Sequence, residues 1–137
     1  MENTLWTFVS SVGRDLLVEW AENSRLPTKV RAQLDQKLDV LRQHSFDSVA
    51  HSKLLAGPVA PHVYKLRVNG TIAVRILLCR GPVTVEIEYT LLQGAIEKDG
   101  RLDPRDAATR ACSHRAEVLR APALHRKDHV CFSPTAH

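Results

Sequence analysis

The sequence predicts an α+β domain in which an N-terminal helical hairpin packs on a twisted, mainly antiparallel sheet of three or four strands, followed by a C-terminal helix. Residues 62–96 contain three runs rich in β-branched and aromatic side chains, with turn-forming pairs between them. Apolar side chains recur at helical spacing between residues 13 and 44, and a further helical pattern follows the strand region. With 137 residues, the chain is large enough to bury a single hydrophobic core.

The N-terminal part of the chain is expected to contain one short strand and two helices. Residues 5–9 fit the strand, and residues 13–23 and 28–44 follow the helical period. Pro27 separates the two helices, and Thr28 is a suitable first residue for the second. The short link predicts a helical hairpin that packs one apolar stripe against a sheet.

The expected sheet places three basic side chains on one face. Its strands are residues 63–68, 72–79 and 84–92. Successive side chains of a strand point to opposite faces, so the apolar side chains of the first two strands leave Lys65, Arg67 and Arg75 together on the other face. Such a cationic face suits an anion, above all phosphate.

The turn between the first two strands sets their register. A loop of residues 69–71 pairs Lys65 with Arg75 and keeps the apolar side chains together, whereas a slip by one residue would separate them. The alternative to an anion site is an exposed polar face whose positive charges are offset by Glu86 and Glu88 of the third strand.

The C-terminal part of the chain is expected to contain one helix and a tail. Residues 104–119 fit a helix that begins at Pro104, with Asp103 available as its cap. Residues 121–137 contain two prolines and no hydrophobic period, which predicts a flexible tail. The expected organisation is therefore one domain over residues 1–120 followed by this tail.

The composition restricts the class of protein. A net charge of +4 and a pI near 9.2 favour a polyanionic partner, while an aromatic content of 5% argues against a base-stacking platform. No apolar run approaches the ~20 residues that span a bilayer, and no secretory signal pattern is evident. Three cysteines without C-x-x-C spacing fit a reducing compartment, so we expect a cytoplasmic protein without membrane contact.

Possible metal ligands are concentrated near the C-terminus. They are Cys112, His114, His125, His129 and Cys131. Their spacing does not give a compact ligand pair followed by a second pair, as structural zinc sites require. The sequence also has no Gly-rich phosphate loop and no local pattern for Ser-His-Asp or Cys-His catalysis. We therefore predict neither a metal nor a cofactor.

A set of short motifs, taken in order, resembles a known family. The motifs are Lys-Leu-Leu at 53–55, Lys-Leu-Arg at 65–67, Val-Arg-Ile at 74–76, LLQGAIEK at 91–98 and DPRDAATRA at 103–111. Together with the two preceding helices, they are similar to the RelE/ParE superfamily of bacterial toxins, and above all to its HigB-type, phage-derived subgroup. The resemblance covers residues 9–119 and implies a RelE-like domain.

This resemblance implies the toxin of a type II toxin–antitoxin system. Such toxins are cytoplasmic endoribonucleases (mRNA interferases) that inhibit translation, usually by cleaving mRNA on the ribosome, and a cognate antitoxin, commonly of helix-turn-helix type, neutralises them. The implied hydrolase reaction needs no metal, because the ribose 2′-OH attacks the adjacent phosphate and leaves a 2′,3′-cyclic phosphate. It requires cations around the developing charge and groups that transfer protons. The resemblance leaves the oligomeric state open.

The family motifs assign roles to individual residues. Arg67 and Arg75 match the arginines of two adjacent strands, and Lys98 matches the second lysine of a Lys-Lys pair, so these three are the implied catalytic residues. Lys53 lies where relatives often have a basic residue before the sheet, and Lys65 adds a cation to the same face, so both are implied to bind RNA.

Three positions depart from the family pattern. Gln93 is a further implied RNA-binding residue but replaces a histidine, Ala95 replaces a phenylalanine, and Glu97 replaces the first lysine of the pair. The losses of an imidazole and of a positive charge remove an acid–base group and weaken the field around a phosphate. Two alternatives to a nuclease therefore stay open: a non-catalytic RelE-like binding module and a ParE-like topoisomerase inhibitor.

Overall fold

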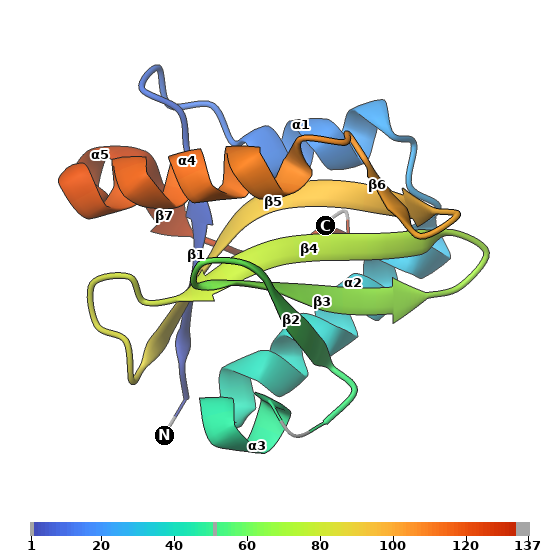
Figure 1. Ribbon diagram of the computed structural model, residues 1–137, viewed down its shortest axis with the longest axis horizontal. Coiled ribbons are helices and arrows are strands. Elements are labelled where there is room, and N and C mark those ends of the chain that lie inside the picture. The colour runs from blue at the N-terminus through green and yellow to red at the C-terminus, as the bar shows by residue number, and fades with distance from the viewer. Residues whose placement is uncertain (1, 51, 134–137) are drawn as a thin grey trace.

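The computed structural model describes residues 2–50 and 52–133. In this part of the chain, a single mixed sheet lies between helices on both of its faces (Figure 1). The elements in chain order are β1 (Thr4–Phe8), α1 (Leu16–Asn23), α2 (Thr28–Gln43), α3 (Phe46–Ala50), β2 (Leu55–Ala60), β3 (Val63–Asn69), β4 (Ala73–Arg80), β5 (Glu88–Lys98), β6 (Arg101–Asp103), α4 (Ala107–Arg120), α5 (Pro122–His125) and β7 (Arg126–Asp128).

The sheet has seven strands in the order β2-β3-β4-β5-β1-β7, with β6 paired to β5. The strand β1 runs parallel to β5, and the other pairs are antiparallel. The class is α+β, but the predicted architecture of a helical hairpin on a three- or four-stranded sheet is wrong. Helices also follow the sheet, at the C-terminal end of the chain, and cover its second face.

Each face of the sheet has its own hydrophobic core because both sets of alternating side chains in β4 are apolar. Val74, Ile76 and Leu78 pack beneath α1 and α2, whereas Leu77 and Cys79 pack beneath α4. The helix α4 approaches closely because its buried positions include two alanines, at 107 and 111. This second core explains why β4 is buried along nearly its whole length.

One glycine lets α1 lie against the middle of β5. A Cβ atom on Gly94 would be only 2.2 Å from ring atoms of Trp20. The indole therefore occupies the volume that any other side chain at this position would need. Trp20 packs on the edge of the larger core, as its place in an apolar pattern indicates.

The β3–β4 hairpin differs from its predicted register by two residues. Arg67, and not Lys65, is the partner of Arg75, and Lys65 is opposite Leu77. A shift of two residues preserves the faces of both strands, because side chains alternate with a period of two. Lys65, Arg67 and Arg75 thus belong to one face of the sheet, although the predicted loop at residues 69–71 is wrong.

The third predicted strand starts four residues later than expected, because Gly81 and residues 82–87 form a turn region before β5. Glu86 is exposed in this region, and Glu88 is buried. The Glu88 carboxylate accepts hydrogen bonds from Val83 N and Thr84 N, each at 3.1 Å, and pairs with a β7 arginine at 2.6 Å. Its charge therefore holds the turn and does not offset the cationic face.

The described part of the expected tail is folded. Residues 122–125 form α5, and β7 pairs with β1. Phe132 is buried in the larger core, and its backbone N–H donates to the Asp35 carboxylate at 2.7 Å. The prediction failed because these residues are ordered by contacts with distant elements and not by a local period. Residues 134–137 lie outside the described part. No helix in the described ranges is both long and apolar enough to span a membrane.

Candidate anion-binding site

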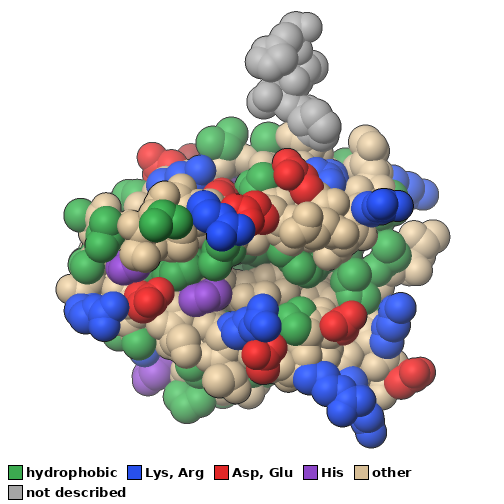
Figure 2. Space-filling view, turned by 90° about the horizontal axis from the view of Figure 1, so that it is seen from above, with side chains coloured by type: hydrophobic (Ala, Val, Ile, Leu, Met, Phe, Trp, Pro, Cys, Tyr) green, Lys and Arg blue, Asp and Glu red, His purple; other side chains and the backbone are tan. Residues whose placement is uncertain are grey.

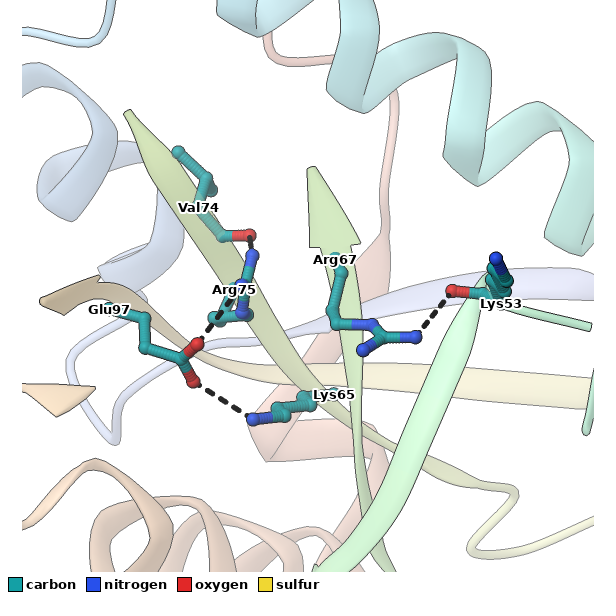
Figure 3. Close-up of polar contacts among 6 residues, drawn as sticks. All are labelled: Lys53, Lys65, Arg67, Val74, Arg75 and Glu97. Atoms are coloured by element: carbon teal, nitrogen blue, oxygen red, sulfur yellow. Dashed lines mark hydrogen bonds and ion pairs between the residues drawn. The ribbon is translucent and has the colours of Figure 1, made fainter. Parts of the chain in front are cut away.

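The basic residues predicted for the site divide into two groups. Figure 3 shows that Arg75 and Lys65 point toward Glu97, whereas Arg67 points away from them toward Lys53. The strands β3 and β4 place the three basic side chains on one face because their alternate positions are taken by apolar core residues. The shared face therefore does not by itself bring all three charges to one point.

Glu97 joins the first group. Its side chain projects from β5 on the same face as Ala95, which is the partner of Arg75. Arg75 Nη2 donates to Glu97 Oε2 at 3.0 Å, and Lys65 Nζ donates to Glu97 Oε1 at 2.9 Å (Figure 3). Arg75 Nη1 also donates to the carbonyl oxygen of Val74 at 2.9 Å. One carboxylate thus holds two of the cations that were expected to bind phosphate.

The charge of Glu97 is itself stabilised by this arrangement. The hydrogen bond from Lys65 lowers the pKa of the carboxyl group below its ordinary value, against the opposing effect of burial, and Arg75 lowers it further. Only 6% of the Arg75 side chain is exposed. Water could therefore not easily take the place of the Glu97 carboxylate as a hydrogen-bond partner of this guanidinium. At neutral pH, Glu97 therefore occupies the position that an anionic ligand of Arg75 would take.

Arg67 belongs to a second group, which lines a cleft of about 430 Å³ between α2 and the end of β3. Its Nη2 donates to the carbonyl oxygen of Lys53 at 3.1 Å (Figure 3). The cleft is lined by Gln33, Gln36, Lys37, Lys53, Arg67, Val68 and Asn69. None of these side chains is acidic, so the cleft combines three cations with three amide groups.

The contribution of α2 to this cleft was not predicted from the sequence. Gln33, Gln36 and Lys37 are spaced at i, i+3 and i+4, so they lie on one side of the helix. That spacing was visible in the sequence. The approach of this side of α2 to Arg67 was not visible, because it depends on how the helix crosses the sheet.

Lys98 and Gln93 lie apart from these two groups. Lys98 is exposed at the end of β5, where it lines a cleft with Arg101, Arg105 and two aspartates of the β5–β6 region. Gln93 is half-buried between α1 and α4, and its Nε2 donates to the carbonyl oxygen of Gly94 at 3.0 Å. The predicted catalytic set Arg67, Arg75 and Lys98 is thus spread over three places.

His114 and His125 act in packing. His114 stacks on Phe8 with ring centroids 4.0 Å apart, and His125 lies near the same ring at 5.7 Å. Burial lowers the pKa of His114, which favours its neutral form in this stack. Across residues 2–50 and 52–133, no three His, Cys, Asp or Glu side chains gather in a way that could hold a metal ion.

The surface that carries α1 and α4 shows basic and acidic side chains next to one another, without a single large basic patch (Figure 2). The net charge of +4 is therefore not concentrated on this side.

No protein-family model, curated protein or solved structure matches this chain.

Proposed function

We propose that the chain is the toxin of a type II toxin–antitoxin system, an endoribonuclease that cleaves mRNA, in the cytoplasm and on the ribosome, and is neutralised by an antitoxin. The observation that carries the proposal is the cross-strand pair of Arg67 and Arg75 on one face of the sheet. The two guanidinium groups point in different directions in the free protein, so Arg67 would have to turn from the Lys53 carbonyl toward Arg75 for both to contact one phosphodiester, whose geometry guanidinium groups match. The acid-free cleft beside Arg67 would extend this contact to a neighbouring phosphate.

The proposed reaction requires a rearrangement around Glu97. The ribose 2′-OH loses its proton to a base as its oxygen attacks phosphorus, the bond from phosphorus to the 5′-oxygen breaks, and the 5′-oxygen takes up a proton, which leaves a 2′,3′-cyclic phosphate and a 5′-hydroxyl. The bound phosphate would replace the Glu97 carboxylate at Arg75 and Lys65, since both are engaged in the free protein. Arg75 would then stabilise the negative charge that develops in the transition state.

The test is cleavage of ribosome-bound mRNA by purified protein. We expect Arg67→Ala and Arg75→Ala each to lower the cleavage rate by about 10²–10³, as loss of a charge-stabilising donor does in other enzymes. Lys98→Ala should have a smaller effect because this side chain lies apart from the pair. Arg120→Ala is the matched control, since its side chain is 74% exposed on α4. Unchanged cleavage by folded Arg67 and Arg75 variants would rule out the mechanism.

A second function, a non-catalytic binding module, is favoured by the contacts of Glu97. A carboxylate that binds both Arg75 and Lys65 competes directly with a phosphate ligand. In this case the purified protein would bind RNA or the ribosome without cutting, and Glu97→Gln would increase binding. Cleavage that is lost in the Arg67 and Arg75 variants would exclude this function.

A further inference from the structure

A second acid-free cleft lies at the far end of β4 from Arg75. It has a volume of about 280 Å³ and is lined by His62, Tyr64, Arg80, Val85 and Arg115. These residues come from the β2–β3 turn, β3, β4, the turn before β5, and α4. Arg75 and Arg80 are separated by five residues of strand, or roughly 16 Å, so the two places cannot share one phosphate group.

The two arginines of this cleft have different surroundings. The Arg80 guanidinium lies over the Phe46 ring at 4.2 Å from its centroid. Arg115 lies close to the Cys79 thiol, where burial raises the thiol pKa to about 12 and the positive charge of Arg115 opposes part of that rise. The cleft is therefore lined by two basic side chains from different elements, β4 and α4, and the first of them is fixed by an aromatic ring.

Neither arginine uses its full set of donors. The Nε atoms of Arg80 and Arg115 are buried and have no hydrogen-bond partner. The ion pairs found in residues 2–50 and 52–133 involve neither of them. These Nε atoms are closed to solvent, so an anion in the cleft would be held by the terminal Nη donors of the two guanidinium groups, neither of which is engaged by a carboxylate in the described residues.

We propose that this cleft binds the phosphate group of a nucleotide. Arg80 and Arg115 would hold the phosphate oxygens, because a guanidinium offers donors in the planar geometry that phosphate accepts. The rings of Tyr64 and His62 and the partly exposed Val85 side chain provide a surface for the base. The inference does not depend on the proposed ribonuclease activity, since the cleft contains none of the residues assigned to it.

The first measurement follows the arginine Nε–H signals of the wild-type protein by NMR at constant ionic strength. The probes are inorganic phosphate, a nucleoside 5′-monophosphate and the matching nucleoside. We expect saturable shifts for Arg80 and Arg115 with the first two probes, tighter binding of the nucleotide than of phosphate, and no saturable shift with the nucleoside. Absence of shifts at both arginines would overturn the site, and equal affinity for nucleotide and phosphate would overturn the role of the base.

Substitutions provide the second measurement. Arg80→Gln and Arg115→Gln should each weaken nucleotide binding about tenfold or more, as loss of a charged hydrogen-bond donor does. Arg120→Gln, on the exposed side of α4, should leave it unchanged. Because the NMR experiment uses the wild-type chain, the proposal is tested even if a variant does not fold. RNA oligonucleotides with a 5′-phosphate or a 5′-hydroxyl distinguish the end of a strand from a free nucleotide.

Discussion

Glu97 controls the charge of the candidate site because it binds two of its cations with one carboxylate. A strand that carried lysine here would leave Arg75 and Lys65 open to an external anion. With glutamate, one of the two positive charges is offset, both side chains are engaged in the free protein, and Arg75 is kept ordered in a nearly dry environment. Binding of an external phosphate therefore has to compete with an internal ligand.

The first prediction concerns the stability of Glu97→Gln as a function of pH. The pKa of Glu97 is lowered in the folded state from its ordinary value of 4.5. The ionised side chain therefore stabilises the fold fully at a pH above 4.5, and this stabilisation is lost as the pH falls through the lowered pKa. Glu97→Gln should cost about 1–3 kcal/mol of unfolding free energy at pH 7, as loss of a charged hydrogen bond does. Urea unfolding should show the difference from wild type shrinking as the pH falls below 4.5 and through the lowered pKa, and a constant difference would contradict the ion-pair role.

The second prediction concerns Gly94→Ala. The added methyl group would meet Trp20 at 2.2 Å, so α1 or the indole must move, at a cost of about 1–3 kcal/mol or more. Gly70→Ala is the matched control, because its methyl group would meet only the flexible end of the Gln33 side chain, at 3.2 Å. Denaturant unfolding measures both variants. An equal cost for the two would show that the indole does not fix this packing.

At the scale of elements, the length of the local pattern decided what the sequence could predict. The helix α2 and the strands β3 and β4 have long, regular patterns, and their existence was predictable. The strands β6 and β7 have three residues each and become strands only by pairing with β5 and β1. Such pairing depends on the neighbouring strands, so no local hydrophobic period predicts it.

The same distinction applies to the candidate site. Alternation in β3 and β4 was sufficient to place Lys65, Arg67 and Arg75 on one face, even with the register wrong by two residues. The ion pair with Glu97 required the register of β5, which shifts where Gln93 pairs with Leu77 but Leu91 with Leu78. The direction of the Arg67 side chain depends on its torsion angles. Neither the register of β5 nor these torsion angles can be predicted from a local sequence pattern.

The third prediction concerns the C-terminal segment, which packs against α1 and α2. Phe132 is buried in the larger core, so Phe132→Ala should cost about 3–5 kcal/mol of unfolding free energy. Val130→Ala is a control in the same segment, and its effect should stay within about 0.5 kcal/mol because the side chain is 75% exposed. Urea unfolding measures both. Similar small values for the two variants would mean that the segment contributes little to the fold.

At the scale of the whole molecule, two separate clefts are lined by basic side chains without an acidic one. The cleft beside α2 holds Lys37, Lys53 and Arg67, and the cleft beside α4 holds Arg80 and Arg115. Elsewhere, acidic side chains lie among basic ones, as on the face in Figure 2. An anionic ligand would thus gain from specific contacts more than from the modest overall charge of +4.

The last prediction follows from this distribution and concerns the salt dependence of RNA binding. If single-stranded RNA releases counterions at the three cations of the α2 cleft, the logarithm of the binding constant should fall with that of the salt concentration with a slope of about −2. Raising salt from about 50 to about 200 mM would then weaken binding about twentyfold.

The variant Lys37→Gln tests whether this cleft is responsible for the slope. It should make the slope shallower by about 0.7, because one phosphate contact is removed, whereas Arg120→Gln should leave it unchanged. Glu97→Gln should act in the opposite direction, since it frees Arg75 and Lys65 for a further phosphate and steepens the slope. Fluorescence anisotropy with a short labelled RNA measures all three. A slope that responds equally to Lys37→Gln and Arg120→Gln would mean that RNA is attracted by the net charge alone, and that the cleft is not its binding site.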